Sequence, residues 1–423
     1  MCGISGIYSV QLPEDAERRL QSMNDRIAHR GPDDQGTYVG EKIALGQRRL
    51  AILDLSPAGH QPMFDQSRKL AIVFNGEIYN FREIRAEIND YPFKTQSDTE
   101  VILAAYLKWG KECLHKFNGM FAFAIWDFEK QDLFIARDRL GIKPLYYHHK
   151  DGVFLFSSEV RGILDSGLVD RKINREVIDE YFTYQTVHAP NTLIKDVYML
   201  MPGHHLYAKD GKIEIGQWWS PRDNYSTASE GKSYQEVCKD VYTLLMEAVE
   251  RRLISDVPFG AFLSGGIDSS AVVGLMSRIQ EQKVKTFTIV FDEEEFSEAK
   301  FARMVANKFQ TDHHEFRLKP DDFLRELPVA LSSLDHPSGD GPNSYTVSKI
   351  TREAGITMAL SGLGGDELFA GYPVFNRSIQ LEQKKWLFQV PRSLRTAGGA
   401  LYSALKKDTT AKKTAQLHGL KDG

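Results

Sequence analysis

A cysteine stands at position 2, directly behind the initiator methionine. A small residue at this position favours removal of Met1, which would leave Cys2 with a free α-amine. The thiol would then be a nucleophile, and the amine, with a pKa of about 8, its local base. On its own Cys2 could equally be an ordinary second residue, so the interpretation depends on what else the chain carries.

Four polar segments follow Cys2 and could support attack on an amide. They are residues 29–33 (HRGPD), 48–54 (RRLAILD), 75–80 (NGEIYN) and 97–100 (SDTE). Such attack needs hydrogen-bond donors for the oxyanion that develops on the carbonyl. The side-chain amide of Asn75 and the backbone N–H of Gly76 could supply two, because glycine lets the backbone approach closely.

Binding of free glutamine also needs charged partners. Arg49 could bind the α-carboxylate, and Asp98 could accept from the α-ammonium group. Each segment also has a simpler interpretation: a structural arginine, an Asn-Gly turn, and a helix cap at Ser97 or Asp98. Their joint occurrence in this order behind Cys2 favours the catalytic interpretation.

Two glycine-rich turns mark the second half, at residues 262–270 (FLSGGIDSS) and 360–369 (LSGLGGDELF). An apolar strand, a glycine turn and a helix start would point backbone N–H groups at a phosphate. Asp268 would repel bare phosphate, so it makes sense only with Mg²⁺, for which Asp366 is the second candidate ligand. The first turn lacks the Gly-Lys-Ser/Thr ending of a Walker A loop. The candidate ATP-binding residues here are Leu263, Ser264, Gly265, Gly266, Asp268, Ser269, Ser361 and Gly362.

The elements that must position these groups differ between the two halves. Short strands at 70–74, 121–126, 133–136 and 153–156, with helices near 83–89 and 100–108, predict an antiparallel, sheet-rich domain to about residue 207. The strand at 70–74 is expected to run into an Asn-Gly turn. Residues 208–232, rich in turn-forming residues, are expected to be a linker.

Beyond the linker, strands and helices alternate. We expect strands at 259–263, 284–291 and 356–360, and helices at 269–279, 297–309 and 345–353. This alternation is typical of βαβ units and a parallel sheet.

The segments behind Cys2 resemble the glutaminase domain of class II, N-terminal-nucleophile amidotransferases. The resemblance spans residues 2–207 and implies an αββα sandwich of antiparallel sheets. It assigns Cys2 as the nucleophile and Asn75 and Gly76 to the oxyanion hole. It assigns glutamine binding to Arg49, Asn75, Glu77 and Asp98.

Residues 233–423 are similar to ATP pyrophosphatases, which implies a doubly wound parallel α/β domain of the adenine-nucleotide hydrolase type. In that family the position of Ile289 contacts adenine, and Asp268 and Asp366 would hold Mg²⁺. The order of the two domains is that of B-type, glutamine-hydrolysing asparagine synthetases. The implied reaction hydrolyses glutamine at Cys2 and passes ammonia to an aspartate that ATP has activated as an acyl-adenylate. The products would be asparagine, glutamate, AMP and pyrophosphate.

Two departures from the family keep alternatives open. Leu363 stands where well-studied members carry a glutamate, and leucine can neither accept a proton nor hold an ammonium group. The acceptor could therefore be another carboxylate, such as a sugar acid in surface-polysaccharide synthesis. The family's chain also continues past the end of this one and carries its catalytic lysine there. A truncated chain with glutaminase activity alone is the third alternative.

Composition limits which binding partners and which cellular compartment we expect. The 423 residues carry a net charge of −4, which gives no basic field for nucleic acid. No apolar run approaches the length of a membrane span, about 20 residues. The sparse set of Cys2, Cys113 and Cys238 is no disulfide framework, so we expect a reducing cytoplasm. The expected partners are glutamine, ATP and aspartate, and a homodimer is left open.

Overall fold

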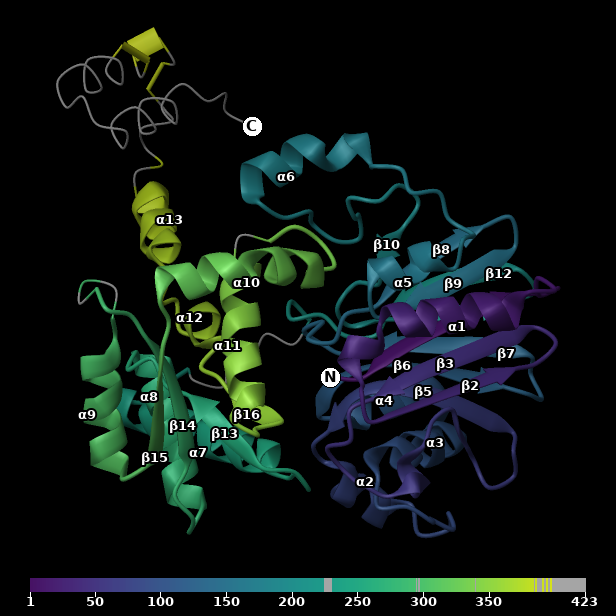
Figure 1. The fold of residues 1–423 in the computed structure, drawn as a ribbon, viewed down its shortest axis with the longest axis horizontal. Helices are drawn as coiled ribbons and strands as arrows, with labels where there is room; N and C mark the ends of the chain where they lie inside the picture. Colours follow the sequence, from purple (N-terminus) through teal and green to yellow (C-terminus); the bar gives the residue numbers. More distant parts are fainter. Residues whose placement is uncertain are drawn as a thin grey trace.

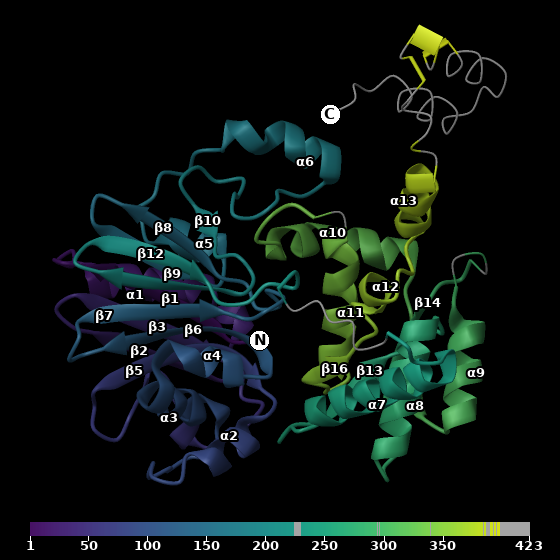
Figure 2. The same ribbon diagram turned by 180° about the vertical axis from the view of Figure 1, so that it is seen from behind.

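The computed structural model describes residues 1–223, 230–293, 295, 297–338, 340–383, 385, 390–391, 393–394 and 396–397. Parts of the expected linker (208–232) and of the expected second domain (233–423) therefore lie outside the described residues. Two domains stand side by side, and both views place the N-terminus on the side of the first domain that faces the second (Figures 1 and 2).

Two six-stranded antiparallel sheets form the first domain. The first sheet has, in order, β10 (Tyr198–Met199), β8 (Tyr146–Lys150), β9 (Val153–Ser157), β1 (Gly3–Ser9), β3 (Ile43–Arg49) and β2 (Asp34–Val39). The second has β12 (Lys212–Gln217), β11 (His204–Lys209), β7 (Asp132–Arg137), β6 (Gly119–Asp127), β5 (Leu70–Ile78) and β4 (Met63–Phe64).

Helices cover the outer face of each sheet. The first sheet carries α1 (Ala16–Arg26) and α5 (Val160–Asp165), and the second carries α2 (Phe81–Glu87), α3 (Asp98–Trp109) and α4 (Cys113–Lys116). The helix α6 (Ile178–Tyr184) stands apart from these layers (Figure 1). The result is the expected αββα sandwich.

Strand β5 shows why its sequence is a continuous apolar run rather than an alternating one. Ile72 and Phe74 pack into the core beneath α3, whereas Ala71 and Val73 pack between the two sheets. Successive side chains point to opposite faces, and here both faces are buried.

The expected Asn-Gly turn does not exist, because β5 continues through it to Ile78. Asn75 pairs with Ala122 and Gly76 with Phe121 on β6. A Cβ on Gly76 would lie 2.3 Å from the Met120 carbonyl oxygen, so this glycine serves close strand approach rather than a turn.

The first domain also extends past residue 207. That residue lies inside β11, and β11 pairs with β12, so the hairpin carries the second sheet to Gln217. The turn between the two strands has positive φ at Asp210 and Gly211, a local hairpin signal, so the boundary expected at 207 falls inside this hairpin.

A four-stranded parallel sheet forms the second domain, in the order β15 (Asp312–Arg317), β14 (Lys285–Val290), β13 (Phe259–Phe262) and β16 (Met358–Leu360). One face packs against α7 (Tyr234–Arg252), α8 (Ile267–Ile279) and α9 (Ala299–Phe309). The other face meets α11 (Gly341–Glu353), which follows α10 (Pro320–Ser333). The described chain goes on to α12 (Gly365–Leu368) and α13 (Pro373–Gln383). Helices on both faces make this the expected doubly wound α/β domain.

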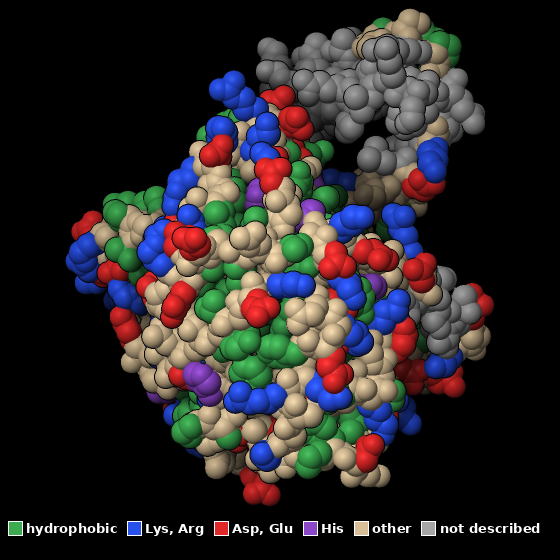
Figure 3. All heavy atoms as spheres, turned by 90° about the vertical axis from the view of Figure 1, so that its right-hand side faces the viewer, with side chains coloured by type: hydrophobic (Ala, Val, Ile, Leu, Met, Phe, Trp, Pro, Cys, Tyr) green, Lys and Arg blue, Asp and Glu red, His purple; other side chains and the backbone are tan. Residues whose placement is uncertain are grey.

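The surface agrees with the modest net charge. On the face shown in Figure 3, acidic and basic side chains are interspersed around apolar ones. No helix in the described part of the chain combines the length and apolar character that crossing a membrane requires.

Candidate active site

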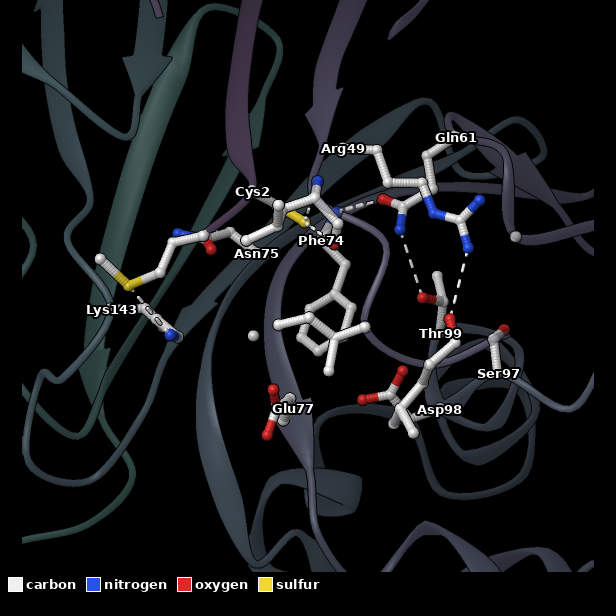
Figure 4. A pocket seen from close by; sticks show the side chains of 16 residues that line it. Cys2, Arg49, Gln61, Phe74, Asn75, Glu77, Ser97, Asp98, Thr99 and Lys143 are labelled. Carbon is white, nitrogen blue, oxygen red and sulfur yellow. Dashed lines mark hydrogen bonds between the residues drawn. The ribbon is translucent and has the colours of Figure 1, made fainter. Parts of the chain in front are cut away.

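Cys2 lies at the start of β1, where this strand pairs with the end of β3. The thiol lies 3.6 Å from the Leu50 carbonyl oxygen, and the Leu50 N–H donates to Sγ at 3.4 Å. Burial raises the pKa of the Cys2 thiol, and the Leu50 hydrogen bond opposes this. The pairing of β1 with β3 thus holds the sulfur at the rim of a pocket that β5 and α3 also line (Figure 4).

Asn75 is the member of this pocket with unused hydrogen-bonding capacity. Its side chain is 1% exposed, and neither Oδ1 nor Nδ2 has a partner. Buried amides normally pair, so a side chain left in this state is suited to a ligand. Gly76 and Glu77 line the same pocket, as expected. Burial raises the pKa of Glu77, and Lys143 counteracts the shift.

The SDTE segment at the start of α3 supplies both a helix cap and a residue of the pocket wall. The Ser97 hydroxyl caps the helix by accepting from the Glu100 N–H at 3.4 Å. The Asp98 carboxylate lies in the pocket wall and accepts from the Ile78 N–H at 2.9 Å. Burial raises the pKa of Asp98 to about 7, although that hydrogen bond favours the charged form.

Arg49, at the end of β3, holds the loop that follows it. Its guanidinium donates to the carbonyl oxygens of Ser56 at 3.1 Å and Leu53 at 3.3 Å, and also to that of Asp54. A Cβ on Gly59 would lie 2.0 Å from one of its nitrogens, so the group is closely enclosed. It also lines the pocket, so the structural and the substrate-binding interpretations of Arg49 are compatible.

Two further residues of the pocket carry no sequence signal. Lys143 is 4% exposed, and its ammonium lies 3.2 Å from Met1 Sδ. Burial lowers its pKa, and Glu77 acts in the opposite direction. Gln61 accepts from the Phe74 N–H at 2.7 Å and so fixes β5 beside Asn75. Both lie in loops far from Cys2 in sequence, and only tertiary packing brings them there.

The first glycine-rich turn of the second domain forms a tight loop between β13 and α8. The hydroxyls of Ser264 and Ser269 lie 2.9 Å apart, and Ser269 Oγ accepts from the Ser264 N–H at 3.3 Å. Gly265 has a φ of +86°, which side chains disfavour, and a Cβ there would lie 2.5 Å from Phe301 Cβ. Gly266, the N-cap of α8, is exposed, and its N–H donates to the Ser264 hydroxyl at 3.3 Å within the loop.

The second glycine-rich turn lies against the first. A Cβ on Gly365 would meet Asp268 Oδ2 at 2.2 Å, and one on Gly362 would meet Asp268 Cβ at 2.8 Å. Gly362 therefore adjoins the first loop, and Ser361 precedes it in the same turn. Asp366 is exposed at the start of α12. In the described chain no group of three or more His, Cys, Asp or Glu side chains could hold a metal by itself.

A cavity of about 300 Å³ opens beside the first loop. Its wall includes Leu263 and Ser264, and also Ile289, the position expected to face adenine. Helix α11 closes the opposite side through Thr346 and Ile350. An apolar slot of this size beside a glycine-rich turn could accommodate a purine base.

Family models match both halves of the chain. Residues 1–219 match a glutamine amidotransferase domain, and residues 240–422 match asparagine synthase. The chain is 38% identical to a protein of Methanocaldococcus jannaschii named as glutamine-hydrolyzing asparagine synthetase 2, over 100% of this chain and 84% of that one.

Two Bacillus subtilis proteins named as glutamine-hydrolyzing asparagine synthetases 1 and 3 are 35% and 33% identical, over 90% and 89% of this chain. The chain spans 60% and 64% of their lengths. A solved Bacillus subtilis glutamine phosphoribosylpyrophosphate amidotransferase covers 85% of this chain and 90% of that one, at 14% identity and a TM-score of 0.41. That likeness is too distant to add to the family assignment.

The sandwich fold with Cys2 at its edge, together with the domain match, defines a class II amidotransferase domain joined to a nucleotide-binding α/β domain. The chain belongs to the family of glutamine-hydrolysing asparagine synthetases.

Proposed function

We propose that the chain makes asparagine from aspartate, glutamine and ATP, with glutamine hydrolysis at Cys2. The observation that carries the first half is the buried amide of Asn75, without any partner, in the pocket that holds Cys2. Arg49 and Asp98 on its wall offer opposite charges, as a free amino acid requires.

In the proposed glutaminase step the Cys2 thiolate attacks the side-chain amide carbon of glutamine. Asn75 Nδ2 and the Gly76 N–H stabilise the oxyanion, and the C–N bond breaks as the nitrogen takes a proton and leaves as ammonia. Water then cleaves the thioester to give glutamate. The α-amine of Cys2, once Met1 is removed, is the proposed base.

In the proposed synthetase step the acceptor carboxylate attacks the α-phosphorus of ATP, and pyrophosphate leaves. Ammonia, carried along a protected passage that keeps it uncharged, attacks the acyl-adenylate and expels AMP. The loop at Ser264–Ser269 would bind phosphate oxygens, and the slot beside Ile289 would bind adenine. Asp268 and Asp366 would hold Mg²⁺ together with those oxygens, which suits an ion that takes one or two carboxylates and substrate phosphates. The ion would neutralise charge on the departing pyrophosphate.

The acceptor could also be a different carboxylate. Leu363 is 89% exposed on the second glycine-rich turn, so the described residues give this position no packing role. A family glutamate would offer a charge there, and leucine offers none. A sugar acid is therefore the second candidate acceptor.

Two assays test the proposal. Cys2→Ala should abolish glutamate release, while ammonia-driven, ATP-dependent amidation stays intact. When a panel of carboxylic acids is tested, aspartate should stimulate pyrophosphate release. Stimulation by a uronic acid alone would show that the acceptor is a sugar acid and not aspartate. Hydrolysis of glutamine with no ATP-dependent product from any acid would leave a glutaminase only. The assays should use reducing buffer, since Cys2, Cys113 and Cys238 are all free thiols and a cytoplasmic location is proposed.

A further inference from the structure

A carboxylate of the second domain caps a helix of the first. Asp335, just after α10, accepts from the backbone N–H of Val160 at 2.7 Å and of Arg161 at 3.0 Å. These are the first N–H groups of α5, which its own side chains leave uncapped. Burial raises the pKa of Asp335, so the contact lies within a water-poor part of the boundary between the domains.

The side chain of Arg161 contacts residues of both domains. Its Nη2 donates to the Ser333 carbonyl oxygen of the second domain at 2.5 Å. Its Nε donates to Glu159 Oε2 at 2.5 Å and lies 3.6 Å from Asp335 Oδ1. One guanidinium therefore joins a carboxylate of each domain.

Glu159 is connected in turn to Cys2, the proposed nucleophile, through hydrogen bonds of Arg30. Its Oε1 lies 3.0 Å from Arg30 Nη1 and 2.9 Å from His29 Nε2. Arg30 Nε then donates to the Cys2 carbonyl oxygen at 2.9 Å. A continuous set of hydrogen bonds thus runs from Asp335 to the backbone of Cys2.

These groups are buried and charge-matched, unlike a surface ion pair. The side chains of Glu159, Arg30 and Arg161 are 6%, 9% and 13% exposed. Burial would raise the pKa of Glu159, but His29 and Arg30 outweigh it and lower the pKa to about 2. Buried pairs of this kind fix geometry, and removal of one partner leaves the others without satisfied charge.

We propose that Arg161 and Asp335 are positioning residues for glutamine hydrolysis: docking of the second domain holds Glu159 and Arg30 so that Cys2 faces Asn75. The proposal rests on the proposed role of Cys2 as the nucleophile. Because α10 leads through Asp335 into α11, which lines the nucleotide slot, the same contact ties the glutamine site to the domain that uses its ammonia.

The test is Arg161→Met in the full chain, with glutamate release measured under steady-state conditions. We expect kcat to fall about 10-fold with KM for glutamine little changed, because the pocket that binds the substrate remains and only the nucleophile is displaced. Asp335→Ala should give the same loss, and the double variant should lose no more than either single one, because both act through one connection. Arg161→Lys, which keeps the positive charge but not the several N–H donors of the planar guanidinium, should recover part of kcat.

Arg171→Met is the matched control. Arg171, which is exposed, pairs with Asp165 at the other end of α5, and among the described residues its ion pair does not involve Glu159, Arg161 or Asp335, so its kcat should equal that of the parent chain. Wild-type kcat in Arg161→Met, or additive losses in the double variant, would overturn the positioning role. A purely structural role would lower the melting temperature and leave kcat unchanged in the folded protein.

Failure of the underlying function would look different, since Cys2→Ala would then still hydrolyse glutamine. If Arg161→Met does not fold, Arg161→Lys and Asp335→Asn provide the same comparison, because each retains part of the contact.

Discussion

The side-chain amide of Asn75 is buried with both polar atoms unpaired, and the carboxyl of Asp98 is buried nearby, where burial raises its pKa although backbone N–H groups donate to it. Both conditions lower the stability of the fold, since buried polar groups are ordinarily satisfied. This loss of stability is explained if a bound ligand supplies the missing hydrogen-bond partners. These two residues allow predictions about both activity and stability.

Asn75→Ala should lower kcat for glutamine hydrolysis about 10²- to 10³-fold, as loss of one oxyanion donor does elsewhere, with a small effect on KM. Steady-state glutamate release measures both constants. Asn307→Ala, on an exposed turn of α9, is the control and should be neutral. Unchanged kcat in Asn75→Ala would remove Asn75 from the oxyanion hole.

Asp98 should set the acidic limit of glutamine binding. Its pKa in the folded chain is raised from 3.8 to about 7, so the carboxyl becomes neutral below that pH and loses its attraction for the α-ammonium group. We expect kcat/KM to fall as pH drops below about 7, and Asp98→Asn to be inactive throughout.

Asp98 should also affect the stability of the fold, with a pH dependence opposite to that of activity. A carboxyl whose folded pKa is raised binds protons more tightly in the folded state, so its destabilising effect is greatest above pH 7 and disappears as pH falls toward 3.8. Thermal melts at pH 8 should therefore show Asp98→Asn more stable than the parent. Equal melting temperatures would argue that the carboxyl is hydrated.

At the scale of elements, strand ends and helix starts position the candidate catalytic and binding residues. Strand β5 presents Asn75 and Glu77 from one face because strand side chains alternate. In the second domain a tight turn joins β13 to α8, and Gly265 makes that turn possible with its positive φ.

Gly265→Ala should abolish ATP-dependent pyrophosphate release and leave glutamine hydrolysis intact. A Cβ there would lie 2.7 Å from the Ala302 nitrogen and 2.5 Å from Phe301 Cβ, so α9 or the loop must move. Gly355→Ala is the matched control: its φ of +78° imposes similar backbone strain, but a Cβ there meets nothing within 4 Å. Equal ATP turnover in the two variants would show that loop geometry is not what the reaction needs.

At the scale of the whole molecule, the second domain supports the glutamine site at two places. Besides Asp335, Asp256 contacts the loop that Arg49 holds: its Oδ2 accepts from the Asp54 N–H at 2.8 Å, and its N–H donates to the Ile52 carbonyl oxygen at 3.0 Å. Asp54 has a φ of +53°, which a non-glycine residue adopts only when its surroundings enforce it.

Asp256→Ala should therefore raise KM for glutamine several-fold with kcat little changed, because the loop that lines the binding pocket loses a support. Glutamate release against glutamine concentration measures this. Asp240→Ala is the control, since Asp240 pairs with Lys232 on the surface of α7. A fall in kcat alone would mean that this loop acts on the nucleophile instead.

Much of the organisation could be predicted from local sequence. The order of segments behind Cys2, the change from antiparallel to alternating elements, and both glycine-rich turns are read from neighbouring residues, because turn chemistry and side-chain periodicity are local properties. Helix α3 and strand β7 lie where these patterns placed them.

What tertiary structure alone decided is which distant groups meet. The continuation of β5 through Asn75 and Gly76 depends on pairing with β6, and the place of β11 in the second sheet depends on pairing with β7. The burial of Lys143 beside Cys2 depends on a contact between Lys143 and Met1, which are 142 residues apart. The connection through Arg161 depends on a contact between Arg161 and Ser333, which are 172 residues apart. Such contacts are selected by the packing of whole layers and domains, so no local pattern in the sequence encodes them.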